Sequence, residues 1–274
     1  MNNCEEMKIE LGNKEAYIDF TCFPHILMNG SCATGKTYTI LNIVAQMCDK
    51  DRNTKVIYLS DDLSDFKKVE YLCDGSLINK THVMSEDSLI SLLHAIYQQN
   101  EFRVNLLHDT GCCRLSEVNS TVDCYYINNK KYMPDEIVSY FVDNEERFML
   151  ARDSHYLTGI TVRTKETKYL PTRTCIIIDC LDISSYSENF DKEYWNSLEV
   201  VCKLGRCCWQ SLILSSRHAF YENMPCDIMV NIPIRIMFDG DRKTQYRMFG
   251  KEVSFVKDKF LIDICGSFGT VSIW

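Results

Sequence analysis

The chain has 274 residues, of which 46% are hydrophobic, and its formal net charge is −8. This composition supports a buried core and excludes a largely disordered chain, and the negative charge means that any contact with DNA has to come from a local basic patch. No window approaches the ~18 consecutive apolar residues of a membrane helix, no signal peptide is apparent, and the fifteen cysteines show no zinc-ligand spacing, so we expect a cytoplasmic protein with free thiols and no membrane span.

The first elements of the chain form a strand, glycine loop and helix. Short apolar segments predict strands over 17–20 and 25–28, and the second strand leads to Gly30. A helix is predicted over 36–48. The next apolar segment, 55–59, predicts a buried strand that is followed by Asp61 and Asp62, at the edge where open α/β sheets bind ligands.

The middle of the chain begins with an amphipathic helix and then changes character. Leucines and other apolar residues between Ser85 and Asn105 have the spacing of one helix face. From 120 to 170 the pattern predicts a small β-rich insertion, with a hairpin over 122–133, a helix over 134–151 and a strand over 160–162.

The last third of the chain returns to alternating strands and helices. We predict a strand at Cys175–Ile178, a helix over 192–204 and a strand at Ser211–Leu214. Shorter strands are expected over 235–238, 254–256 and 260–264. Strands separated by helices imply a mainly parallel sheet flanked by helices, so the fold class is α/β, in one domain over 1–274 that carries the insertion.

The loop after the second strand carries a complete phosphate-binding motif, G-x₄-G-K-[ST]. Its residues are Gly30, Ser31, Cys32, Ala33, Thr34, Gly35, Lys36 and Thr37. The two glycines let backbone N–H groups converge on phosphate oxygens, and the helix contributes its positive N-terminal end. Lys36 would reach the β and γ phosphates of ATP, and Thr37 would bind Mg²⁺. The alternative is a glycine turn with no ligand, but the flanking strand and helix favour a nucleotide site.

A second group for the metal is expected at the end of a buried strand, and Asp179 occupies that position. The alternative is an acid that only ends the strand. Cys180 follows, where many hydrolysing P-loop enzymes have a glutamate that activates water, so its presence puts hydrolysis in question. Asp182 is a candidate substitute, and an exposed turn acid is its other interpretation.

Four segments besides the core of the P-loop resemble the FtsK/SpoIIIE family. Residues 23–30, Phe-Pro-His-Ile-Leu-Met-Asn-Gly, are similar to that family's P-H-h-L-h-x-G opening. Gly205-Arg206 with 211–216 resembles its A-R-x-x-G-I-H-L-I-L-A-T-Q-R-P segment, and 231–238 resembles its N-I-P-x-R-I-A-F strand. The segment 92–119 is similar to the helix that precedes the family's Tyr-Asn ending.

This resemblance implies a RecA-like motor domain that binds ATP with Mg²⁺ between subunits of a homo-oligomeric ring, usually to translocate double-stranded DNA. Relatives in type VII secretion move proteins with the same domain, and a module that binds ATP without hydrolysing it, beside a partner motor or secretion subunits, is a further alternative. The sequence departs from the family at Cys180 and at Arg217-His218, where the family has Gln-Arg. The resemblance covers a motor domain alone, without the family's membrane anchor or winged helix.

Other residues have two interpretations each. Arg206 and Arg235 are candidates for an arginine that reaches a neighbour's γ-phosphate, and a local contact is the alternative. His218 is either a phosphate sensor or a loop histidine. The lysines and arginines of the insertion form either a nucleic-acid contact or a solvated surface.

Overall fold

The computed structural model describes most of the chain. The described residues are 7–12, 14–51, 54–60, 78–82, 86–110, 112–115, 125–127, 130–132, 137–142, 145–150, 172–180, 188–216 and 224–273. Within these ranges, no helix combines the length and the apolar character needed to cross a membrane. The predicted strand at 160–162 lies outside the described residues, as do Asp61 and Asp62.

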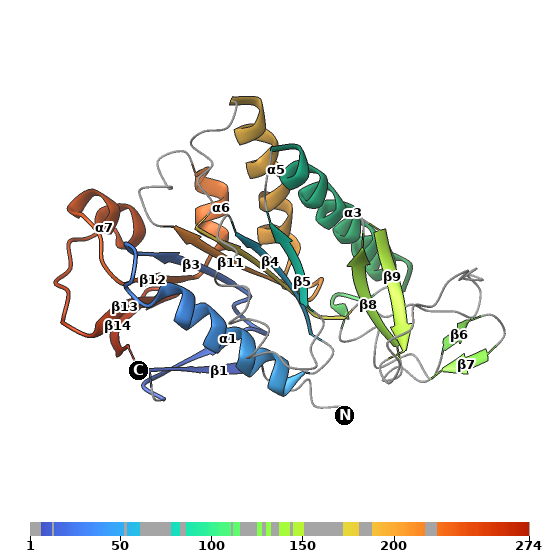
Figure 1. Cartoon of the computed structure of the whole chain (residues 1–274), viewed down its shortest axis with the longest axis horizontal. Helices are drawn as coiled ribbons and strands as arrows, with labels where there is room; N and C mark the ends of the chain where they lie inside the picture. The colour runs from blue at the N-terminus through green and yellow to red at the C-terminus, as the bar shows by residue number, and fades with distance from the viewer. Residues whose placement is uncertain are drawn as a thin grey trace.

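An eight-stranded sheet forms the centre of the fold, in the order β14-β13-β12-β3-β11-β10-β4-β5 (Figure 1). Its strands are β3 (His25–Asn29), β4 (Lys55–Ser60), β5 (Ile78–His82), β10 (Thr174–Asp179), β11 (Gln210–Ser216), β12 (Ile234–Met237), β13 (Lys259–Ile264) and β14 (Ser267–Ser272). Neighbouring strands from β12 to β5 are parallel, whereas β13 and β14 extend the sheet antiparallel. The predicted mainly parallel α/β sheet is confirmed.

Helices cover both faces of this sheet, because its central strands carry apolar side chains on both sides. One core contains residues of α3 (Glu86–Thr110), α5 (Glu188–Leu204) and α6 (Cys226–Asn231) packed against alternate strand residues such as Ile176 and Ile178. The other core contains residues of α1 (Lys36–Lys50) with the intervening strand residues, such as Ile177. The hairpin of β1 (Lys8–Leu11) and β2 (Ala16–Asp19) adds Ile9 and Ile18 to that second core.

The insertion contains two antiparallel hairpins. The first pairs β6 (Tyr125–Ile127) with β7 (Lys130–Tyr132), as predicted. The second pairs β8 (Ile137–Val142) with β9 (Glu145–Leu150), so the predicted helix over 134–151 is wrong. β8 is rich in β-branched and aromatic residues, which favour strands, and Asp143-Asn144 between the strands are turn-forming residues.

The C-terminal region differs from the prediction in one element. Residues 254–256 do not form the expected strand. A short helix, α7 (Arg242–Phe249), precedes them; it begins at Asp241, whose side chain accepts a 2.7 Å hydrogen bond from Thr244 N, and ends at Gly250 with a φ of 69°. Gln245 on this helix accepts a 2.8 Å hydrogen bond from Val253 N, which holds the following segment against the helix instead of in the sheet.

Candidate functional site

The glycine motif lies in the connection between β3 and α1, as predicted. A Cβ atom on Gly30 would be 2.9 Å from Cβ of Phe238 and 3.0 Å from Oγ1 of Thr34, so a larger residue would displace the loop. Gly35 immediately precedes α1 with a φ of 99°, which an L side chain rarely adopts. The first turn of α1 contains no acidic residue, so no charge within the helix itself opposes its positive end.

Lys36 folds back over this loop. Its Nζ donates to the backbone oxygen of Gly30 and, at 2.6 Å, to that of Ser31, and the side chain is buried. A second loop contact joins Thr34 Oγ1 to the same oxygen of Ser31 at 2.9 Å. The ammonium group is therefore fixed beside the backbone that the motif assigns to phosphate.

Asp179 ends β10 next to the motif and is 1% exposed. Its Oδ2 accepts hydrogen bonds from Thr37 Oγ1 at 3.1 Å and from Tyr58 Oη at 2.7 Å. Its Oδ1 is buried and has no hydrogen-bond partner among the described residues. A carboxylate oxygen without a partner beside a threonine hydroxyl fits a Mg²⁺ ion, which prefers oxygen ligands.

Cys180 has an environment that keeps its thiol neutral. Burial, followed by the charge of Asp179, raises the pKa of Cys180 to about 11. Its Sγ is 3.5 Å from Oγ of Ser215 on β11. A thiol with this pKa remains protonated near neutral pH, so Cys180 cannot replace a carboxylate as a base. Asp182, the predicted substitute, and His218 lie outside the described residues.

The end of β11 connects the two halves of the site. The backbone oxygen of Ser216 accepts a 3.2 Å hydrogen bond from Gly30 N, and that of Ser215 accepts a 3.0 Å bond from Cys180 N. β11 lies between β3 and β10 in the sheet. One strand therefore sets the separation between the phosphate loop and the segment of Asp179.

Two contributors to the site were missed from the sequence. Tyr58 orients Asp179 from the neighbouring strand β4. The sequence indicates this role only through a tyrosine within a buried strand, since a buried hydroxyl needs a hydrogen-bond partner. Asp239 follows β12, and its carboxylate accepts from Ser31 N at 2.5 Å and from Ser31 Oγ. Asp239 thus supports the first turn of the phosphate loop, a role that only the pairing of β12 with β3 reveals.

The candidate arginines do not belong to this chain's own site. Arg235 donates to the backbone oxygens of Met248 at 2.6 Å and Met229 at 3.1 Å, so it has the local role that was the alternative prediction. Arg206 lies in the turn before β11, whereas the phosphate loop follows the opposite end of the parallel strand β3. A contribution of Arg206 to a neighbour's site stays a prediction.

Comparison with protein family models and with curated proteins finds no match. Several solved structures match nearly the whole chain. One is the pCW3 conjugation coupling protein TcpA in a monomer form with ATPγS, with 16% identity, a TM-score of 0.66, and coverage of 98% of this chain and 66% of that chain. The fold is that of a RecA-like P-loop ATPase.

Two further matches are type VII secretion ATPases, which the sequence resemblance implied as relatives. ATPases 2 and 3 of EssC from Geobacillus thermodenitrificans share 12% identity with a TM-score of 0.62, over 98% of this chain and 45% of that chain. The cytoplasmic domain of EccC from Thermomonospora curvata shares 15% identity with a TM-score of 0.55, over 98% of this chain and 26% of that one. The chain thus spans only part of these three proteins, and the likeness is one of fold.

Proposed function

We propose that the chain is an FtsK/SpoIIIE-like motor domain that binds ATP with Mg²⁺ and couples its hydrolysis to translocation of double-stranded DNA as a homo-oligomeric ring. One observation supports this most directly: Lys36, Thr37 and Asp179 lie together at the carboxyl ends of the strands. One buried oxygen of Asp179 has no hydrogen-bond partner among the described residues and can bind a cation. Asp179 lies 142 residues after Thr37 in the sequence, so the fold brings it to the phosphate loop.

Each side chain has a defined task in this proposal. Lys36 neutralises charge on the β and γ phosphates, and the backbone of residues 30–35 surrounds them. Thr37 and Asp179 hold Mg²⁺, which when bound neutralises charge that develops on the phosphate oxygens. The thiol of Cys180 stays protonated near neutral pH and cannot take a proton from water, so we expect slow turnover.

Two observations favour other members of this class. The EssC and EccC matches support a protein-translocating domain, and one matching EccC structure, with 14% identity and a TM-score of 0.53, is in complex with a signal sequence peptide. The neutral thiol of Cys180 supports a module that binds ATP without hydrolysing it. All three functions share the same nucleotide site.

The nucleotide site is tested with the variant Lys36→Ala. Mg-ATP at about 100 times its Kd should stabilise the wild-type fold by about 2.7 kcal/mol, because ligands stabilise the state that binds them. Lys36→Ala should abolish this stabilisation in thermal melting and the heat in titration calorimetry. Lys14→Ala, at an exposed lysine outside the site, is the matched control. An unchanged wild-type melting temperature in millimolar Mg-ATP would refute the site.

A DNA-stimulated ATPase assay separates the three functions. A DNA motor should hydrolyse ATP faster with duplex DNA, in a salt-sensitive manner, because the contact rests on local basic groups. Hydrolysis that is indifferent to DNA but stimulated by a secreted peptide favours protein translocation. Binding of ATP without turnover in either condition favours the non-hydrolysing module.

A further inference from the structure

Arginines from separate segments line one small pocket at the edge of the sheet where the parallel strands begin. They are Arg114 after α3, Arg173 before β10, and Arg206 between α5 and β11. The phosphate loop and Asp179 lie at the other edge, since they follow the carboxyl ends of β3 and β10. The pocket is therefore separate from the ATP site.

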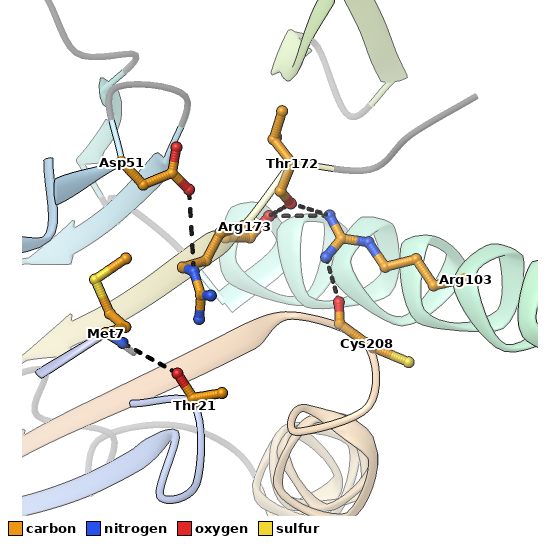
Figure 2. Close-up of polar contacts among 8 residues, drawn as sticks. Met7, Thr21, Asp51, Arg103, Thr172, Arg173 and Cys208 are labelled. Carbon is orange, nitrogen blue, oxygen red and sulfur yellow. Dashed lines mark hydrogen bonds and ion pairs between the residues drawn. The ribbon is translucent and has the colours of Figure 1, made fainter. Parts of the chain in front are cut away.

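Arg173 is the buried member of this group, with 8% of its surface exposed. Its guanidinium carbon lies 5.7 Å from the ring centre of Trp209, and its Nε is 4.0 Å from Oδ2 of Asp51. Figure 2 shows this guanidinium on the side of Thr21, while that of Arg103 approaches the same strand from the other side. Arg173 is thus held between fixed groups and points into the pocket that Thr21 also lines.

Arg103 of α3 fixes the two segments that form the pocket wall (Figure 2). It is fully buried and donates through Nη2 to Thr172 O at 3.1 Å and to Thr174 Oγ1 at 3.0 Å, on either side of Arg173. Through Nη1 it donates to Cys208 O at 2.6 Å, immediately before Trp209. The backbone positions of the pocket are therefore set before any ligand arrives, which lowers the cost of binding.

The charge in this pocket contrasts with the charge of −8 on the chain. None of the residues that line it is acidic: they are Phe20, Thr21, Pro24, Arg114, Arg173, Gly205, Arg206, Trp209, Gln210 and Ser211. Among the described residues, Asp51 approaches Arg173, and Asp19 accepts a 2.9 Å hydrogen bond from Thr21 N. The pocket brings three guanidinium groups together beside these two carboxylates.

The shape of the pocket restricts its ligand. Its enclosed part has a volume of about 20 Å³, which admits about one water-sized group and excludes a base or a sugar. The hydroxyl of Thr21 accepts from Met7 N at 3.1 Å and makes a side-chain hydrogen bond to the carboxylate of Asp19, so the donors for a ligand are the guanidinium groups. Arg114 and Arg206 are exposed at this pocket, and guanidinium groups bind phosphate through paired hydrogen bonds.

We propose that this pocket is a second anion site that binds a phosphate group, either free phosphate or a phosphate of a nucleic-acid backbone, with Arg173 at its base and Arg114 and Arg206 at its mouth. One phosphate oxygen enters the pocket and the rest of the group remains outside it. The site does not depend on the nucleotide site, because the two lie at opposite edges of the sheet.

The test uses the Lys36→Ala chain, in which the phosphate loop is disabled. Sodium phosphate should raise its melting temperature more than sodium chloride or acetate at equal ionic strength, and calorimetry gives the affinity. Adding Arg114→Gln and Arg206→Gln should weaken phosphate binding about tenfold for each arginine removed. These two side chains are exposed, so the variant keeps its core. Arg242→Gln, at an exposed arginine paired with Glu252, is the matched control.

Phosphate stabilisation no greater than that by chloride or acetate, or equal binding in the Arg114→Gln/Arg206→Gln chain, would overturn the proposal. A short DNA duplex then distinguishes the sources. A duplex that competes with phosphate and loses affinity in the same variant identifies the backbone of a nucleic acid as the ligand. Phosphate binding that is unaffected by the duplex identifies the free ion.

Discussion

Cys180 directly follows the acid assigned to the metal, and its backbone and thiol make a clear test possible. Its φ of 56° shows that this position already accepts an L side chain in the left-handed region. If the missing carboxylate limits turnover, Cys180→Glu should raise kcat by about 10² to 10⁴, the contribution of a positioned general base, with little change in ATP affinity. Steady-state ATPase assays measure both quantities.

The controls separate the carboxylate from other effects of the substitution. Cys180→Gln introduces a side chain of the same size as Cys180→Glu does, but without the negative charge, and should leave kcat low. Asp182→Asn tests whether the acid two residues later already activates water. Brisk wild-type hydrolysis that survives Asp182→Asn and is not improved by Cys180→Glu would show that the catalytic acid lies elsewhere.

The hydroxyl of Tyr58 orients the metal-binding acid. Tyr58→Phe removes the 2.7 Å hydrogen bond to Asp179 Oδ2 and leaves the ring in place. Loss of such a supporting contact usually weakens metal binding about 10- to 100-fold. The Mg²⁺ concentration that half-saturates ATP binding should rise accordingly, whereas Tyr246→Phe, at an exposed tyrosine of α7, should not change it. An unchanged Mg²⁺ dependence in Tyr58→Phe would contradict this supporting role of the Tyr58 hydroxyl.

Some residues of the site can be predicted from the sequence, because they belong to a single short motif or stand at the end of a single apolar strand. Lys36 and Thr37 have the spacing of a phosphate loop, and Asp179 ends a buried strand. Tyr58 and Asp239 could not be predicted in the same way. Their partners are set by the order of strands β12-β3-β11-β10-β4, and strand order depends on long-range packing that no local pattern records.

Individual elements differ in how strongly their sequence specifies them. α3 was predicted because Leu89, Leu93 and Ile96 recur at helical spacing, and these side chains are buried in one core. The sequence of β8 and β9 fits the helical period as well as the strand period, and the antiparallel pairing of the two strands decides between them. β14 has little apolar alternation and forms only because β13 provides an edge.

One side chain connects α3 with the beginnings of β10 and β11. Arg103→Met keeps an unbranched apolar side chain but removes the guanidinium that donates to the oxygens of Thr172 and Cys208 and to the hydroxyl of Thr174. Each buried group that loses its partner costs about 1 to 3 kcal/mol, so we expect unfolding to become easier by about 3 to 5 kcal/mol. Urea denaturation measures this loss. Arg242→Met on the surface should change stability by less than about 0.5 kcal/mol, and an equal effect of both variants would contradict the assignment.

The whole molecule should assemble when it binds nucleotide, if a neighbour completes the site. Light scattering should then show oligomers in Mg-ATP or a slowly hydrolysed analogue, and closed assemblies of this kind have cyclic symmetry. Lys36→Ala should remain in its nucleotide-free state under the same conditions. A chain that stays monomeric at high concentration with the analogue would count against the ring.

Arg206 and the phosphate loop lie at opposite edges of one sheet, and β11 spans the distance between them. Six residue steps from Gln210 to Ser216 correspond to about 20 Å along an extended strand. A single copy therefore cannot bring Arg206 to its own nucleotide. If Arg206 does reach a nucleotide, the surface around Arg206 in one copy must meet the phosphate loop of another copy. Repeated in one direction, this contact builds a closed ring or an open filament, and made twice about a two-fold axis it builds a dimer with two reciprocal sites.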